Sequence, residues 1–340
     1  MKHFRFSILV TVICLAAAFL WGGWMGMAIA TILGVMEVSL SFDNAVVNAA
    51  KLKTMSAFWQ KLFLTVGILI AVFGMRLFFP VEIVSVATGM GFMEVANLAL
   101  RNPAEYSRHL LDSHVQIAMF GGIFLLLVFL SFILDEEKEL HWLGKFEERL
   151  AKFGKLDMIT VIIALLVVVI TQRFLPQEER LDAILAGVAG IILFIAVDSL
   201  GRLFESEEGA AVAANAKRAG LMGLLYLEVL DASFSFDGVI GAFAITKDVV
   251  IIMLGLAIGA MFVRSMTVFL VQKGTLDEYV FLEHGAHYAI GALALIMLAS
   301  TSYHIPEIVT GLIGVGFIVL SLWSSVLYKR REQAEEEVEA

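Results

Sequence analysis

The stretch Glu37-Val-Ser-Leu-Ser-Phe-Asp43-Asn44-Ala-Val-Val-Asn48 lies inside the apolar run 26–50. Carboxylate, hydroxyl and amide side chains therefore stand where a membrane-spanning helix is expected to be hydrocarbon. Ionisable groups at that depth cost several kcal/mol, roughly, unless they face a cavity, a partner or an ion. This stretch is the first candidate for a functional site.

A second copy of the pattern appears 194 positions later, as Asp231-Ala-Ser-Phe-Ser-Phe-Asp237-Gly238. Glu37 corresponds to Asp231, and Asp43 to Asp237. The shared pattern is an acid, any residue, Ser, an apolar residue, Ser, Phe and Asp. A match of this length, twice within apolar runs, indicates an internal duplication.

The composition is that of a membrane protein with several helical spans. The chain has 340 residues, of which 60% are hydrophobic and 17% charged, and its mean hydropathy is +0.88. A soluble domain has about a quarter charged residues. The net charge of −9 comes partly from an acidic tail, and nothing predicts a nucleic-acid surface. Cys14 is the single cysteine, which excludes an intramolecular disulfide and a cysteine metal cluster.

One apolar segment, 81–100, decides the number of spans because it also carries Glu82, Glu94 and Asn97. Loops rich in Lys and Arg are normally on the cytoplasmic side of the membrane. The basic connections and both termini can all lie on that side only if 81–100 does not cross. We therefore expect 81–100 to be re-entrant or interfacial. The fold class is then an all-α polytopic membrane protein with ten spans, near 6–22, 26–50, 57–79, 116–134, 157–174, 182–203, 222–245, 249–271, 281–301 and 305–328.

Ten spans would send the two motif helices across the membrane in opposite directions. We predict two inverted three-helix repeats, 26–134 with an insert near 81–110, and 222–301, an arrangement that many secondary transporters share. The other segments are the first transmembrane helix 1–25, a cytoplasmic loop 135–156, linking helices 157–221, a last helix 302–328 and an acidic cytoplasmic tail 329–340.

The motif side chains are hard oxygen ligands, which suit Mg²⁺, Ca²⁺ and Mn²⁺. On an ideal helix Glu37 and Asp43 point about 240° apart, so an unbroken helix cannot aim both at one ion. Either the helix is locally unwound, or one acid faces the site and the other a gate. Inverted packing would gather up to four carboxylates, which repel unless a divalent cation or protons neutralise them. The predicted ligands are Glu37, Asp43, Asn44, Asp231, Asp237, Ser41 and Ser235.

Two arginines offer a structural alternative, because they could pair with these acids. Arg76 ends the helix after the first motif, and Arg264 lies in the helix after the second. Glu283, His284 and His287 resemble a metal cluster by composition, but a structural role is favoured for them at the start of a span. The predicted supporting residues are Arg76, Arg264, Asp198, Glu228 and Asn48.

The motif pair resembles the TerC family of bacterial integral membrane proteins. That family carries an acid followed by Leu-Ser-x-Asp-Asn in its first half, matched here by Glu37 and the stretch 40–44. Its second half carries an acid followed by Phe-Ala-x-Asp-Ser, matched by Asp231 and the stretch 234–238. Gly238 departs from the family's serine. The resemblance implies a bacterial inner-membrane location and a link to manganese efflux or tellurite resistance.

These features predict a secondary transporter, not an enzyme, that exports a divalent cation, with Mn²⁺ favoured and protons as a counter-ion. No prosthetic group is expected. The expected partners are the lipid bilayer and the cation, and the 135–156 loop could bind a soluble partner. The alternative is a non-transporting scaffold or tellurite-type stress-resistance protein that acts through soluble partners. An intramembrane hydrolase is disfavoured, because the sequence has no His-Glu-x-x-His helix, nucleophile elbow or phosphate loop.

Overall fold

The computed structural model describes residues 4–70, 74, 76, 78–155, 158–205, 212–303 and 305–339. These residues are almost entirely helical, and none of them forms a β-strand. The helices are α1 (Arg5–Leu40), α2 (Phe42–Lys53), α3 (Ala57–Leu69), α4 (Phe79–Thr88), α5 (Phe92–Arg101), α6 (Pro103–Asp112), α7 (His114–Ile133), α8 (Lys145–Ala151), α9 (Ile159–Thr171), α10 (Arg180–Glu205), α11 (Val212–Ile245), α12 (Val249–Lys273), α13 (Thr275–Glu278), α14 (Leu282–Ser300) and α15 (Glu307–Glu339), with short 3₁₀ turns at Lys152–Lys155 and Gln172–Phe174.

Several of these helices can cross a membrane. By length and composition, six candidate spans lie within the described ranges: Arg5–Leu40, His114–Ile133, Arg180–Ser199, Val249–Lys273, Leu282–Ser300 and Val309–Arg331. A seventh is added if Lys145–Gly154 and Ile159–Phe174, which meet at 97°, form one broken span. The protein is thus an all-helical membrane protein, but this count does not confirm the ten spans expected from the sequence.

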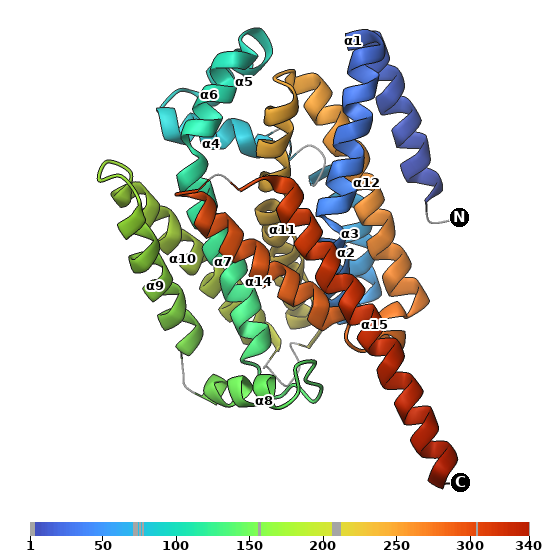
Figure 1. The fold of residues 1–340 in the computed structure, drawn as a ribbon. Helices are drawn as coiled ribbons and strands as arrows, with labels where there is room; N and C mark the ends of the chain where they lie inside the picture. The colour runs from blue at the N-terminus through green and yellow to red at the C-terminus, as the bar shows by residue number, and fades with distance from the viewer. Residues whose placement is uncertain are drawn as a thin grey trace.

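Two helices, α1 and α11, account for part of the difference between the ten expected spans and the six or seven candidates. The 36 residues of α1 include Gly23, whose φ of 62° and ψ of −155° interrupt the helix. Figure 1 shows the blue chain rising from the N-terminus and descending again, so α1 consists of two arms, as the expected spans 6–22 and 26–50 require. The helix α11 has 34 residues and is long enough to span a membrane. It is not among the six candidates because Glu228, Asp231 and Asp237 make it more polar than they are.

The segment 81–100 does not form one spanning helix. α4 and α5 have ten residues each, or about 15 Å, which is half of the roughly 30 Å of a bilayer core. Gly89, with a φ of 72°, ends α4. In Figure 1, α4, α5 and α6 lie at the end of the bundle opposite α8 and the C-terminus. This agrees with the expectation that the segment does not cross.

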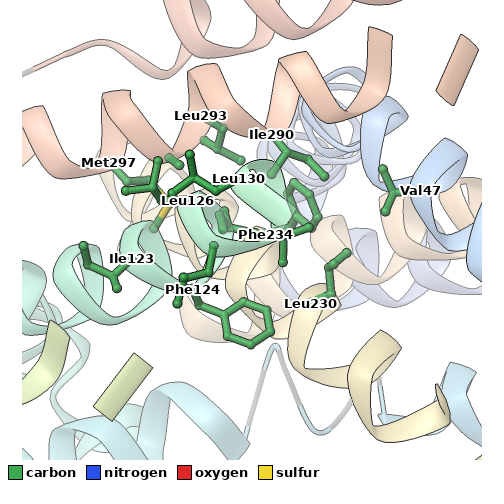
Figure 2. Packing of buried hydrophobic residues seen from close by; sticks show 14 of the residues in the cluster. Val47, Ile123, Phe124, Leu126, Leu130, Leu230, Phe234, Ile290, Leu293 and Met297 are labelled. Atoms are coloured by element: carbon green, nitrogen blue, oxygen red, sulfur yellow. The ribbon is translucent and has the colours of Figure 1, made fainter. Parts of the chain in front are cut away.

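α7 forms the centre of the bundle. Most of its side chains are buried, and most of these belong to one apolar cluster that also draws on α2, α9, α10, α11 and α14. Figure 2 shows Phe124 and Leu126 of α7 packed among Phe234 of α11 and Leu293 of α14. A Cβ on Gly122 would lie 3.0 Å from Leu298 Cγ, so small residues let α7 and α14 approach closely.

A second close crossing holds the first motif helix against α12. A Cβ on Gly34 would lie 3.0 Å from Ile258 Cγ2, and one on Gly255 would lie 2.6 Å from Leu33 Cβ. Such small-residue crossings drive helix association in membranes, where lipid removes most of the hydrophobic drive between helices. The crossing presses the end of α1, and with it Glu37, into the protein interior.

Candidate functional site

The first motif helix is broken inside the motif. α1 ends at Leu40, Ser41 takes φ −107° and ψ 20°, and α2 begins at Phe42. The break falls between Glu37 and Asp43, and both acids line one small cavity of about 20 Å³. A cavity of this size holds about one water molecule. The local unwinding considered in the sequence analysis is therefore present in the first motif.

Glu37 is neutralised by an arginine. Its side chain is buried, its Oε1 forms an ion pair with Arg76 Nη2, and Ser41 Oγ donates to the same oxygen over 3.4 Å. Arg76 lies in the stretch after α3, where the described residues have π-helical geometry. Oε2 faces Gly238, on which a Cβ would lie 2.5 Å from that oxygen. The carboxylate thus occupies space that a side chain at position 238 would fill.

Asp43 begins α2 and is also buried. Its Oδ1 accepts the Asn44 backbone N–H over 2.9 Å, and its Oδ2 lies 3.7 Å from where a Cβ on Gly314 would stand. A carboxylate in the first turn of a helix is stabilised by the positive end of the helix dipole. This interaction offsets only part of the charge.

The second motif helix is continuous, unlike the first. α11 runs unbroken through Glu228, Asp231 and Ser235, which are spaced so that they share one face. Asn44 Nδ2 of α2 donates to Asp231 Oδ1 over 2.7 Å, and this hydrogen bond joins the two motifs directly.

Within the described part of the chain, buried oxygens without a hydrogen-bond partner occur on both α2 and α11. Each is a buried acceptor with no hydrogen-bond partner among the described residues, and the set consists of Asn44 Oδ1, Asn48 Oδ1, Asp231 Oδ2, Ser235 Oγ and both carboxylate oxygens of Glu228. Buried polar atoms are normally paired, and leaving them unpaired costs about 1–3 kcal/mol each. These oxygens can accept hydrogen bonds from donors or interact with a positive charge.

Arg264 supplies part of that charge. Its guanidinium lies over the Phe63 ring at 3.6 Å and interacts electrostatically with Asp231 and Glu228. Its Nε and Nη2 make no hydrogen bond to any described residue. Arg264 thus balances the acids at longer range, whereas Arg76 contacts Glu37 directly.

The family model described as "Protein of unknown function (DUF475)" matches residues 42–332. The chain belongs to this family. A relative of this DUF475 protein is the "Uncharacterized membrane protein YceF" of Bacillus subtilis (strain 168), which is 24% identical over 205 residues, covering 50% of this chain and 79% of the relative. No solved structure matches the chain.

The three motif acids of the DUF475 protein whose side chains are described do not line one common cavity. Glu37 and Asp43 line the small cavity, whereas Asp231 faces Asn44. The side chain of Asp237 lies outside the described residues. Among the side chains that are described, no three His, Cys, Asp or Glu gather closely enough to hold a metal ion. Asp198 lies on α10, and it does not line the small cavity.

The histidines near 284 have structural partners. His284 Nε2 lies 2.9 Å from Leu140 O, and His287 Nδ1 lies 2.9 Å from Glu283 O. The His287 ring also stacks on Phe132 with centroids 3.8 Å apart. These contacts agree with the structural role favoured for them.

Sequence reasoning missed one charged cluster, at the opposite end of the bundle from α4–α6. Glu147 of α8 is fully buried, pairs with Lys138, and accepts the Leu143 N–H over 3.1 Å. Lys138 also donates to Phe132 O over 3.1 Å. The signal available in the sequence was only a mixed-charge segment, which normally indicates a solvated loop.

Proposed function

We propose that this DUF475 protein is a secondary transporter that exports a divalent metal cation, with Mn²⁺ as the favoured substrate. The observation that carries the proposal is the set of buried acceptor oxygens on α2 and α11 that have no hydrogen-bond partner among the described residues. Carboxylate, amide and hydroxyl oxygens are the ligands that Mn²⁺ and Mg²⁺ accept. The resemblance of the two motifs to the TerC family supports the choice of Mn²⁺.

The proposed architecture is a pair of inverted three-helix repeats. Its support is an exchange of contacts: Asp231 meets Asn44, and Glu37 meets Gly238. Under the 194-residue shift, Glu37 corresponds to Asp231 and Asn44 to Gly238, so the two contacts are equivalents of each other. Reciprocal contacts of this kind are characteristic of a two-fold axis. We place the substrate site on that axis, and ten spans with a re-entrant 81–100 segment complete the proposed topology.

In the proposed cycle the cation displaces existing positive charge. Glu37 is paired with Arg76, and Asp231 interacts with Arg264. A buried carboxylate left without a counter-charge is strongly unfavourable, so the acids exchange one positive partner for another as the cation enters and leaves. Protons are the proposed counter-ion, because a protonated carboxylate is neutral and releases the metal.

Metal titration of purified protein tests this proposal. We expect saturable Mn²⁺ binding, weakened at least about tenfold, or 1.4 kcal/mol, by Asp43→Asn and by Asp231→Asn. Glu94→Gln is the matched control, because Glu94 is an exposed acid on α5. Competition with Mg²⁺, Ca²⁺ and Zn²⁺ sets the selectivity. The proposal fails if folded protein binds none of the four ions, or if the two Asp variants bind like the control.

A further inference from the structure

A second, larger pocket lies between α4, α7, α10 and α11 and has a volume of about 540 Å³. Its wall is mostly apolar and includes Phe79, Ile83, Ile117, Phe120 and Met297. Pockets of this size and composition typically hold a drug-sized organic molecule rather than a bare ion. The pocket is therefore built for a different class of ligand from the motif site.

The body of α11 separates this pocket from the proposed cation site. Ser233 lines the pocket, whereas Asp231, two residues earlier, bonds to Asn44 on α2. Residues two apart on a helix point about 200° apart. The pocket is thus not an antechamber of the acidic site, and its ligand would contact the opposite face of the same motif helix.

The charged side chains among the described lining residues are acids, Glu82 and Asp182. Glu82 and Asp182 line it as exposed carboxylates, and Gln116 contributes a buried Oε1 that has no hydrogen-bond partner among the described residues. No Lys, Arg or His occurs among the described residues that line it. Phe79 and Phe120 add aromatic rings, which also attract cations.

The pocket opens between apolar rims. Val86 is 76% exposed and Leu185 is 59% exposed, and both line the pocket. Exposed apolar side chains of a membrane protein favour contact with lipid chains over contact with water. An amphipathic molecule can therefore enter from the bilayer with its apolar body first and leave its charged group beside Glu82 and Asp182.

We propose that the pocket between α4, α7, α10 and α11 binds an amphipathic organic cation. The apolar wall receives the hydrophobic body, and the two carboxylates with the Gln116 oxygen receive the positive group. This inference is independent of the proposed metal transport, because it uses a different cavity and different side chains.

A pair of probes with the same shape and opposite charge tests the proposal. Tetraphenylphosphonium and tetraphenylborate are titrated into purified full-length protein in nanodiscs. We expect one saturable site for tetraphenylphosphonium and at least about tenfold weaker binding of tetraphenylborate. The variant Glu82→Gln/Asp182→Asn is expected to weaken tetraphenylphosphonium binding about tenfold and to reduce the preference between the two probes.

The matched control is Glu94→Gln/Glu137→Gln, which removes the same charge from two exposed acids outside the pocket. It should bind tetraphenylphosphonium like the wild type. Ala186→Phe, which fills the pocket without changing its charge, should weaken both probes. Equal binding of the two probes would mean that the pocket holds only lipid chains, and would overturn the proposal. Equal effects of the acid variant and its control would also overturn it.

Discussion

Asn44 donates from Nδ2 to Asp231 Oδ1 over 2.7 Å, across 187 residues of sequence. The two residues belong to the two copies of the motif, so one hydrogen bond joins the two copies directly. Asp231 keeps its other oxygen, Oδ2, buried and without a partner among the described residues. The same contact thus orients the carboxylate and leaves its second oxygen without a hydrogen bond among the described residues.

Removing the amide should destabilise the protein. Hydrogen bonds to charged groups contribute about 1.5–3 kcal/mol, and Asn44→Ala is expected to lose an amount in this range, measured as a lower melting temperature in detergent. Asn97→Ala is the control, since Asn97 is exposed and bonds within its own helix to Met93 O. Equal melting temperatures for the two variants would contradict the structural role assigned to Asn44.

Gly238→Ala should destabilise the protein although alanine is the better helix former. The new Cβ would stand 2.5 Å from Glu37 Oε2, so the carboxylate or the helix must shift, at a cost of about 1–3 kcal/mol. Gly316→Ala, where nothing lies within 4 Å, should instead be neutral or stabilising by up to about 1 kcal/mol. Thermal melts of both variants distinguish the two sites. Adding Glu37→Asp, which shortens the acid, should restore part of the loss at position 238.

Breaking the buried ion pair on one side should be worse than removing both charges. Arg76→Gln leaves the buried charge of Glu37 without its partner and should cost about 3–5 kcal/mol. The double variant Glu37→Gln/Arg76→Gln should recover much of that stability while losing metal binding. Chemical unfolding of the two single variants and the double variant measures the coupling. If the losses in unfolding free energy of the two single variants add up to the loss of the double variant, Glu37 and Arg76 do not interact as described.

The sequence predicted the membrane class, and it predicted that 81–100 would not form one spanning helix. The breaks around Gly89 and Gly91 divide 81–100 into two short helices because glycine readily takes the positive φ that ends α4. Glycine and hydropathy patterns are local properties, and for this reason they can be read without a structure. The ten spans stay a prediction, because the acids in α11 and the bend at Gly23 obscure the count.

The grouping of the acids could not be predicted. Helix spacing showed that Glu37 and Asp43 point apart on a continuous helix, but only the break at Ser41 brings them to one cavity. Whether Asp231 faces Asn44 or the other acids depends on how α11 is rotated against α2. That rotation follows from packing over the whole helix, and the motif alone does not specify it.

The buried contact between Glu147 of α8 and Lys138 should contribute less to stability in acid. Burial raises the pKa of Glu147, but hydrogen bonds from Lys138 and the Leu143 N–H, with the charge of Lys138, lower it below its ordinary value of 4.5. A group with a depressed folded pKa stabilises the protein above its unfolded pKa, and this contribution disappears as the pH falls through the folded pKa.

Melting temperatures between about pH 6 and about pH 3 test this expectation. The wild type should lose more stability over this range than Glu147→Gln does. Glu148→Gln serves as the control, because Glu148 is exposed and its ion pair with Lys152 lies at the surface. A Glu147→Gln variant that matches the wild type at every pH would show that the buried pair contributes nothing to the pH dependence.

The most direct test of the account is Mn²⁺ flux in proteoliposomes that contain the purified protein. With a pH gradient imposed, we predict Mn²⁺ movement by the wild type and by Glu94→Gln, and movement at background level by Asp43→Asn and Asp231→Asn. All four proteins must first be shown to insert and to melt cooperatively. Flux by the two Asp variants at the wild-type rate would contradict the acidic site between α2 and α11, and no flux by well-folded wild type would contradict the transporter itself.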